Sequence, residues 1–400
     1  MAKLRKLVIL LLLIATLSAH AEIAFRGAWI ATVANIDWPT PAAVGNDSLQ
    51  KAEMTWILDS LESLGINAII FQVRPTADAL YYSEYEPTSH WLMGTQGAAL
   101  TYDPLEWTIE EAHKRNMEVH VWLNPYRVNL AKTDTSIIAP NHIFRQHPEW
   151  FWSYAKQWYF DPGLDVTREW ICTIVQDIVY RFDIQAIHMD DYFYPYPQGK
   201  QPLPDEATFA KYPRGFTDIR DWRRDNVNLA IQAISETIRE CKPEVQFGIS
   251  PFGVWRNASV DSTGSATTAG ITNYDDLYAD IRLWIKNGWI DYVLPQLYWE
   301  IGKKAADYEV LAHWWANEVK GTNCKLYIGM APYRLENASP KTPWGVGNEI
   351  GRQMELNRTI PEISGECFYS TRPLLRNPRG VCDTIKSIYS EKEDYFLPWE

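Results

Sequence analysis

The sequence predicts a single (β/α)₈ barrel, also called a TIM barrel, in the α/β class. Eight short apolar runs of the kind found in buried parallel strands alternate with eight amphipathic helical patterns. Segments from a helix to the next strand are short, whereas several segments from a strand to the next helix are long. This asymmetry is typical of barrels that carry an active site at the carboxyl ends of their strands. An open, doubly wound sheet is the weaker alternative.

The eight strand candidates are largely apolar on both faces, as expected for strands covered by helices outside and by side chains inside. They are expected at Phe25–Thr32, Ala68–Val73, Glu118–Asn124, Ala186–Asp190, Gln246–Pro251, Tyr292–Trp299, Lys325–Ala331 and Glu366–Ser370.

Helices are predicted between the strands, where apolar residues recur with helical spacing. Asp103, Pro104 and Glu106 form a capping arrangement at the start of one helix, so we assign Asp103 to that helix and not to a site. The helices are expected near residues 48–64, 104–115, 167–181, 221–240, 275–287, 307–319, 347–358 and 376–390.

The connections also bound the number of domains. Gly65–Asn67, Phe182–Gln185 and Gly288–Asp291 are short links that precede strands. The links after the first five strands span about 15, 30, 42, 29 and 22 residues, and a plain barrel needs roughly 250. Together these lengths account for nearly the whole chain, and no linker or repeat marks a second domain. We expect one catalytic domain over residues 22–400.

Residues 1–21 are predicted to be a cleavable signal peptide. Basic residues lead into the apolar run Leu7–Leu17, which is too short to cross a bilayer and is followed by Ala19-His20-Ala21. We therefore expect an exported protein, periplasmic or extracellular. No later stretch is apolar enough to span a membrane.

Charge and cysteine content exclude some classes of function. The chain has 50 acidic and 38 basic residues, a net charge of −12, and no basic stripe, which argues against a nucleic-acid partner. The five cysteines are widely spaced without a Cys-x-x-Cys pair, so one or two disulfides are possible after export but a redox or zinc motif is not indicated. The sequence does not fix an oligomeric state.

The segment Ile187–Pro197 (Ile-His-Met-Asp-Asp-Tyr-Phe-Tyr-Pro-Tyr-Pro) is the strongest candidate for a site. Alternation along the strand directs His188 and Asp190 toward the barrel axis and the apolar residues between them toward the helices. A buried carboxylate without partners costs several kcal/mol, so Asp190 must meet water, a ligand or fixed donors.

A helix-capping role for Asp190 and Asp191 conflicts with the residues that follow them. The prolines at 195 and 197 prevent a helix from starting there, so neither carboxylate caps one. We interpret both as candidate catalytic residues.

Polar side chains recur at the ends of other predicted strands and should meet at one mouth of the barrel. Each alone can be a structural group, but their convergence favours a site. They are Gln72, Arg74, Asn124, Arg127, His188, Gln296, Tyr298 and Glu300. We expect Arg74, Asn124, Asp190 and Tyr298 in particular to share one cleft, with Arg74, Asn124 and His188 lowering the pKa of Asp190.

Aromatic residues gather in the same long loops. Their flat apolar faces with a polar edge suit sugar rings, although many must pack the loops instead. The set is Trp38, Trp91, Tyr126, Trp150, Trp152, Trp158, Tyr159, Tyr192, Tyr194, Tyr196, Trp255, Trp299 and Trp344. Of these we assign Trp38, Tyr126, Tyr192, Tyr194 and Trp299, together with Asp37, to substrate binding.

Other chemistries fit the sequence less well. It contains no Gly-x-Ser-x-Gly elbow, Walker loop or His-Glu-x-x-His motif. A metal site built from His120, His188, Asp190 and Asp191 is conceivable, but no His-x-His pair supports it. We therefore expect neither a metal nor a cofactor.

Five motifs in order resemble the glycosyl hydrolase-like 10 family. They are Phe25 to Pro39 (FRGAWIATVANIDWP), Phe71 to Pro75 (FQVRP), Trp122 to Arg127 (WLNPYR), His188 to Pro195 (HMDDYFYP) and Pro295 to Trp299 (PQLYW). The resemblance implies an exported bacterial barrel, often a lipoprotein, with glycosidase activity on peptidoglycan glycan strands in some members. This chain lacks a lipobox cysteine, so the resemblance does not extend to a lipid anchor.

The combined hypothesis is an exported glycoside hydrolase that acts on a cell-envelope amino-sugar glycan such as peptidoglycan. Glycosidases need two carboxyl groups. We expect Asp190 to stabilise charge at the anomeric carbon, and Glu300, ahead of Asp191, to be the acid with a raised pKa, because adjacent residues point apart. The alternatives are a catalytically silent glycan-binding barrel and a glycosidase for a dietary or capsular polysaccharide.

Overall fold

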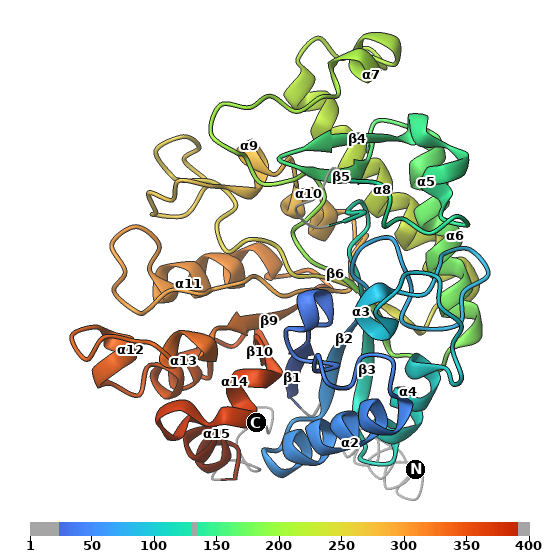
Figure 1. Ribbon diagram of the computed structural model, residues 1–400. Coiled ribbons are helices and arrows are strands. Elements are labelled where there is room, and N and C mark those ends of the chain that lie inside the picture. The colour runs from blue at the N-terminus through green and yellow to red at the C-terminus, as the bar shows by residue number, and fades with distance from the viewer. Residues whose placement is uncertain (1–23, 130–133, 391–400) are drawn as a thin grey trace, which may run out of the picture.

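The computed structural model describes residues 24–129 and 134–390, and within them eight parallel strands close into a barrel (Figure 1). This confirms the predicted fold class. The predicted signal peptide lies outside the described residues. In barrel order, the strands are β1 (Phe25–Ile30), β2 (Ala68–Arg74), β3 (Glu118–Leu123), β6 (Ala186–Met189), β7 (Gln246–Ile249), β8 (Tyr292–Val293), β9 (Lys325–Met330) and β10 (Ile363–Phe368), which pairs with β1.

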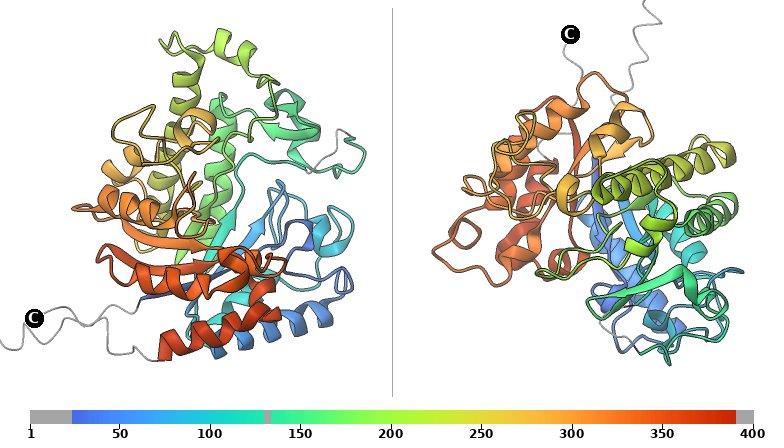
Figure 2. Two further views of the ribbon diagram at one scale, coloured as in Figure 1. Left: turned by 90° about the vertical axis from the view of Figure 1, so that its left-hand side faces the viewer. Right: turned by 90° about the horizontal axis from the view of Figure 1, so that it is seen from above.

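One main helix follows each strand and lies on the outside of the barrel (Figures 1 and 2). The first and last of them lie side by side and close the outer ring. The eight are α2 (Asp47–Ser63), α4 (Pro104–His113), α6 (Asp165–Arg181), α8 (Ile219–Cys241), α10 (Ile281–Lys286), α11 (Tyr308–Val319), α13 (Glu349–Asn357) and α15 (Val381–Ser390).

Alternation along the strands divides the core into two parts. Ile187 and Met189 belong to the layer between strands and helices, whereas His188 hydrogen-bonds to Tyr292 inside the barrel, as the sequence predicts. Gly248 shows how tightly the interior is filled, since a Cβ there would lie 1.8 Å from the Tyr292 ring. A larger residue at 248 would therefore displace the ring that bridges the barrel axis.

Three predicted elements differ from the observed ones. The strand expected over 292–299 pairs only at β8, because Pro295 has no N–H to donate and the chain continues through isolated bridges at Gln296. The helix expected over 275–287 is broken at Tyr278, which has φ 55°, into α9 (Asn273–Asp276) and α10. The helix expected over 376–390 begins at Val381.

The long insertions all follow strands, so they rise from the carboxyl face. They contain the short helices α3 (His90–Met93), α5 (Ile143–Gln146) and α7 (Glu206–Lys211), besides α9. The sequence did not predict the antiparallel hairpin of β4 (Phe151–Tyr154) and β5 (Gln157–Phe160), which Figure 1 shows near α5. Its turn uses positive φ at Ala155 and Lys156, without the Asn-Gly or Asp-Gly pair that usually marks such turns.

Two further features bear on the sequence predictions. Within residues 24–129 and 134–390, no helix is both long and apolar enough to cross a membrane. All five cysteines are free thiols, and Cys324, Cys367 and Cys382 are buried.

A buried ion pair holds the β2–α4 insertion to the barrel. Arg74, at the end of β2, donates from Nε and Nη2 to the two carboxylate oxygens of Glu86, each at 2.6 Å. Neither side chain is more than 1% exposed. The same guanidinium donates to the carbonyl oxygens of Asn124 and Pro125. One cation therefore ties together the ends of β2 and β3 and the loop that carries Glu86.

Glu86→Gln should lower the free energy of unfolding by about 3–5 kcal/mol, because it leaves the Arg74 charge buried without a countercharge. Urea unfolding followed by tryptophan fluorescence measures this. Asp59→Asn is the control, since Asp59 pairs with Arg115 at 2.6 Å but its side chain is 57% exposed. The control should lose about 1 kcal/mol or less. Equal losses in the two variants would contradict an anchoring role for the buried pair.

Candidate active site

Asp190 lies directly after β6 and is buried among fixed hydrogen-bond donors. Its Oδ2 accepts from Asn124 Nδ2 at 2.6 Å, and its Oδ1 accepts from the backbone N–H of Tyr192 at 3.2 Å. The Trp122 indole and the Arg127 guanidinium also favour its charged form. Even so, burial outweighs these neighbours and raises the pKa of Asp190 above its usual value. The expected lowering of this pKa was therefore wrong, because desolvation is the larger effect.

Asp191 lies beside Asp190 and is only 3% exposed. Its Oδ2 accepts a hydrogen bond from the Tyr196 hydroxyl, and the Gln296 side chain is a further polar neighbour. Burial first, and then the adjacent Asp190 charge, raise the pKa of Asp191 to about 7. Asp191 is thus a carboxyl group that still carries a proton near neutral pH.

The surroundings of the two carboxyl groups decide which one keeps the proton. Asp190 faces two short-range N–H donors and the Arg127 cation, all of which favour a carboxylate. Asp191 is opposed by the charge of Asp190. Two like charges this close do not both ionise easily, so the pair favours a state with one proton, and the donors around Asp190 favour Asp191 as the group that holds it.

Glu300 does not have the environment that a general acid requires. Its Oε2 accepts from the Trp344 indole at 2.9 Å, and its Oε1 pairs with Lys303 at 3.1 Å. Burial raises its pKa, but the hydrogen bonds from its own backbone, Trp344 and Lys303 outweigh burial and the pKa is lowered. The raised pKa expected for Glu300 was therefore wrong, whereas the pKa of Asp191, the second choice for the acid, is raised.

Asn124, Gln72 and Arg127 form a buried polar network behind Asp190. Gln72 Nε2 donates to Asn124 Oδ1 at 2.6 Å, and Arg127 Nη2 donates to the same oxygen at 3.0 Å. Gln72 and Asn124 have no exposed surface. They were predicted to bind substrate, but in this structure they support the carboxylate instead.

Aromatic side chains with some exposure surround the two carboxyl groups. Tyr192 is 37% exposed and lies over the Arg127 guanidinium at 5.2 Å, while Tyr196 contacts both Tyr192 and Phe252. Trp299 packs edge-on against Phe252 at 5.4 Å. These rings give the mouth apolar faces next to polar groups.

A second group of rings lies on the β8–β10 side of the mouth. Tyr298 stacks against Tyr369 and contacts Tyr333 edge-on. Burial is the main reason that the pKa values of Tyr298 and Tyr369 are raised, and the site carboxylates add to it, Asp191 for Tyr298 and Asp190 for Tyr369. The sequence assignment included Tyr298 but missed Tyr333, Tyr369 and Phe252. All three lie within three residues of a strand end, which is the signal that could have identified them.

Several predicted substrate-binding residues are core residues in this structure. Arg74 is fully buried against Glu86 and does not reach the shared cleft expected for it. Tyr126 is 1% exposed, Tyr194 is buried and its hydroxyl accepts from Asn226, and the Trp38 indole donates to the Gln50 carbonyl. Sequence pattern alone could not separate these buried rings from exposed ones.

His188 and Asp37 are likewise structural. The His188 nitrogens lie 2.9 Å from the Tyr292 hydroxyl and 2.9 Å from Ser250 Oγ, and burial lowers its pKa far below the usual value. Asp37 accepts from Ala31 N, Ser370 Oγ and Arg372 N, so it joins the ends of β1 and β10. Neither side chain is free to bind a sugar.

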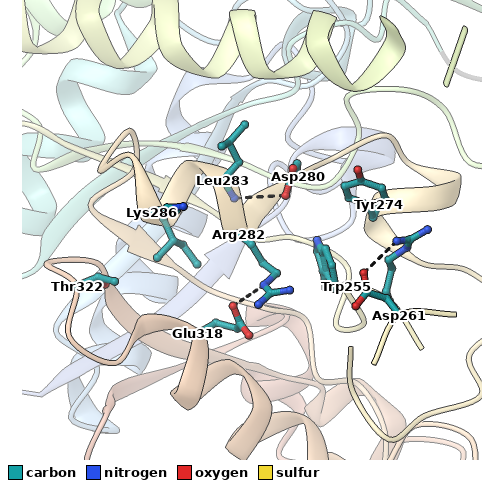
Figure 3. Close-up of a pocket in the computed structure, with 11 residues that line it drawn as sticks. Trp255, Asp261, Tyr274, Asp280, Arg282, Leu283, Lys286, Glu318 and Thr322 are labelled. Atoms are coloured by element: carbon teal, nitrogen blue, oxygen red, sulfur yellow. Dashed lines mark hydrogen bonds and ion pairs between the residues drawn. The ribbon is translucent and has the colours of Figure 1, made fainter. Parts of the chain in front are cut away.

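One cavity, of about 570 Å³, lies between the β7–α10 loop and helices α10 and α11 (Figure 3), and neither Asp190 nor Asp191 lines it. Its guanidinium groups are already paired, Arg256 with Asp275 and Asp261, and Arg282 with Glu318. The Trp255 ring is covered by Trp314 and Arg282. This cavity offers no reactive pair. Within the described ranges, no three His, Cys, Asp or Glu side chains are grouped as metal ligands.

Comparison with known proteins identifies the family of the chain. The family model described as "Glycosyl hydrolase-like 10" matches residues 24–344. Glycosyl hydrolase YngK of Bacillus subtilis is 47% identical over 376 residues, covering 94% of this chain and 73% of that protein. Glycosyl hydrolase DigH of Escherichia coli K12 is 40% identical over 362 residues, covering 86% and 82%.

Solved structures with similar folds are barrels of low sequence identity. The PgaB (BpsB) glycoside hydrolase domain from Bordetella bronchiseptica has a TM-score of 0.56 at 12% identity, covering 92% of this chain and 98% of that one. The catalytic domain of the Paenibacillus polymyxa β-amylase has a TM-score of 0.56 at 11% identity, covering 93% and 100%. At these identities the likeness concerns the fold. The family match and the two sequence relatives carry the assignment: the chain belongs to the glycosyl hydrolase-like 10 family and is a glycoside hydrolase.

Proposed function

We propose that the protein is an exported glycosidase that cleaves a cell-envelope glycan built from N-acetylated amino sugars, such as peptidoglycan. The observation that carries this proposal is the pair of adjacent buried carboxyl groups at the barrel mouth, Asp190 and Asp191, with the pKa of Asp191 raised to about 7. Asp191 donates its proton to the leaving glycosidic oxygen, and the Asp190 carboxylate stabilises the positive charge that develops at the anomeric carbon.

The adjacency of the two carboxyl groups favours a nucleophile that comes from the substrate. Glycosidases that attack with their own carboxylate or with water place the two groups on opposite sides of the scissile bond. Here both follow the same strand and influence each other's charge directly. A 2-acetamido group can supply the attacking oxygen itself, and Asp190 can accept a hydrogen bond from its N–H. This chemistry requires an N-acetylated sugar.

The surroundings of the pair support a sugar ligand. Tyr192, Tyr196, Tyr298 and Trp299 provide ring faces beside polar groups, an arrangement that suits the C–H patches and hydroxyls of a pyranose. The predicted signal peptide supports action outside the cytoplasm, where peptidoglycan is an abundant polymer of N-acetylated sugars. Export and the cell-wall substrate are thus parts of one proposal.

Purified protein should hydrolyse stem-peptide-free peptidoglycan strands and fail on the same strands after N-deacetylation, because the deacetylated sugar lacks the attacking oxygen. Product mass spectrometry measures both, with chitin oligomers, plant glycans and capsular polysaccharide in the same panel. Equal rates on acetylated and deacetylated strands would argue against substrate assistance. Hydrolysis restricted to plant or capsular glycans would support a glycosidase activity but would contradict peptidoglycan as the substrate.

Activity should depend on pH in a way that follows from the raised pKa of Asp191. Since the protonated form is the acid, kcat/KM should fall as pH rises through about 7. Asp191→Asn should lower kcat on natural glycan by about 10²–10⁴-fold, and the loss of kcat on activated aryl glycosides should be smaller. The fall of kcat/KM at alkaline pH should be absent in this variant. Glu300→Gln is the matched control and should keep the wild-type profile. The acid assignment would be refuted if the control, and not Asp191→Asn, lost this alkaline fall.

The export part of the proposal predicts a specific mature N-terminus. When the full chain is expressed in a bacterium with an intact secretion system, cleavage after Ala21 should give a protein that begins at Glu22. Intact-mass spectrometry of the exported fraction measures this. Full-length protein retained in the cytoplasm would contradict export while leaving the enzymatic proposal intact.

A further inference from the structure

A chain of hydrogen bonds crosses four neighbouring strands and ends at Asp190. Strands β1, β2, β3 and β6 are neighbours in the barrel. Thr32 and Val33, just after β1, donate their backbone N–H groups to Gln72 Oε1, each at 2.9 Å. Gln72, in β2, donates to Asn124 after β3, and Asn124 donates to Asp190 after β6, both at 2.6 Å.

The backbone of β1 fixes the direction of this chain. A side-chain amide can rotate and exchange its oxygen and nitrogen, but a backbone N–H can only donate. Two such donors hold the Gln72 oxygen on the β1 side, so the Gln72 amide nitrogen must face Asn124. Asn124 then presents its oxygen to Gln72 and its N–H to Asp190. Arg127 Nη2, which donates to Asn124 Oδ1 at 3.0 Å, supports the same direction.

Burial excludes direct contact between the first members of the chain and a glycan. Gln72 and Asn124 have no exposed surface, and Thr32 is also buried. Each side-chain oxygen and amide nitrogen named above is already used within the protein. An effect of Gln72 on the reaction must therefore act through Asn124.

We propose that Gln72 is a positioning residue that, through Asn124, keeps an amide N–H directed at the catalytic carboxylate of Asp190. Its kinetic consequence rests on the proposed function. If the N–H were replaced by an oxygen, two acceptors would face each other and the carboxylate form of Asp190 would lose a charge-assisted hydrogen bond.

Other groups around Asp190 set its charge, and one of them, Arg127, also supports this polarity because a guanidinium can only donate. Arg127, from the loop after β3, favours the carboxylate and donates to Asn124 Oδ1. Asp191 and Tyr192 lie on the same segment, Tyr196 follows them, and Tyr369 approaches from β10. Within the described part of the chain, the hydrogen bonds of the Gln72 side chain go to Thr32, Val33 and Asn124, so a substitution there leaves these other charges in place.

The principal test is Gln72→Met, which keeps the side-chain length and removes both the donor and the acceptor. We expect kcat to fall at least ten-fold, KM to change less than two-fold, and the acidic limb of the pH profile to move to higher pH. The limb moves upward because Asp190 must be charged to act, and loss of a donor favours its protonated form. A substrate-binding role for Gln72 would instead raise KM.

Gln72→Glu provides a conservative rescue. The carboxylic acid form of the introduced side chain keeps an acceptor for Thr32 and Val33 and an O–H donor for Asn124, so activity should return toward the wild-type value at low pH. Activity should be lost again as pH rises, because ionisation of the introduced carboxyl group removes that donor. This variant also serves if Gln72→Met does not fold.

Gln50→Met is the matched control. Gln50 is fully buried in α2, donates to the carbonyl oxygens of Ala43 and Leu92 and accepts from Tyr102, but it lies outside the chain that leads to Asp190. It should lower the melting temperature as Gln72→Met does and leave kcat and the pH profile unchanged. Matching kinetic losses in the two variants would reduce Gln72 to a fold-stabilising residue.

A measurement without substrate separates this inference from the proposed function. In protein labelled with ¹³Cγ aspartate and assigned with Asp190→Asn, the Asp190 titration should move to higher pH in Gln72→Met and not in Gln50→Met. An unchanged titration in a folded Gln72→Met variant would overturn the inference. If no glycan is cleaved by the wild type, the proposed function fails while this titration still decides the role of Gln72.

Discussion

The site depends on the burial of two carboxyl groups, Asp190 and Asp191, at the end of one barrel strand. Removing a charge from water costs several kcal/mol, and a second like charge beside it costs more. The state with one negative charge on the pair is therefore favoured over the state with two. The protein directs that charge to Asp190 by placing Asn124, the Tyr192 backbone and Arg127 around it. Burial and the charge of Asp190 favour the protonated form of Asp191, against the hydrogen bond that Tyr196 donates to it.

The closed barrel explains how these partners come together from distant parts of the chain. Parallel strands end at one face, so residues after β1, β2, β3 and β6 become neighbours although more than 150 positions separate the first from the last. The ion pair of Arg74 with Glu86 and the contacts of Asp37 with Ser370 and Arg372 hold the intervening loops in place. Stability and chemistry therefore use different polar residues at the same strand ends.

The sequence could predict the barrel and the location of the site because both follow from periodic patterns. Alternation in Ala186–Met189 directs His188 inward, and the end of this strand places Asp190 and Asp191 at the mouth. It could not predict which polar residues face the substrate, because that depends on partners distant in sequence. Glu86, 12 positions along the chain from Arg74, forms an ion pair with it, and Trp344, 44 positions from Glu300, donates a hydrogen bond to its carboxylate. The predicted direction of the Asp190 pKa shift was wrong for the same reason. Polar residues near strand ends indicate hydrogen-bond donors, whereas the extent to which a carboxyl group is buried depends on the whole fold.

The filled interior of the barrel restricts how the site exchanges protons. Beneath the carboxylates, Tyr292 joins His120 and His188, and Phe25 stacks on Tyr327 at 4.2 Å, all of them buried. Burial lowers the pKa of His188 far below its usual value, so this residue is not a store of positive charge. In the proposed reaction, His188 therefore holds no extra proton with which to recharge Asp191, and the two carboxyl groups depend on the mouth at the end of β6 both for the glycan and for solvent.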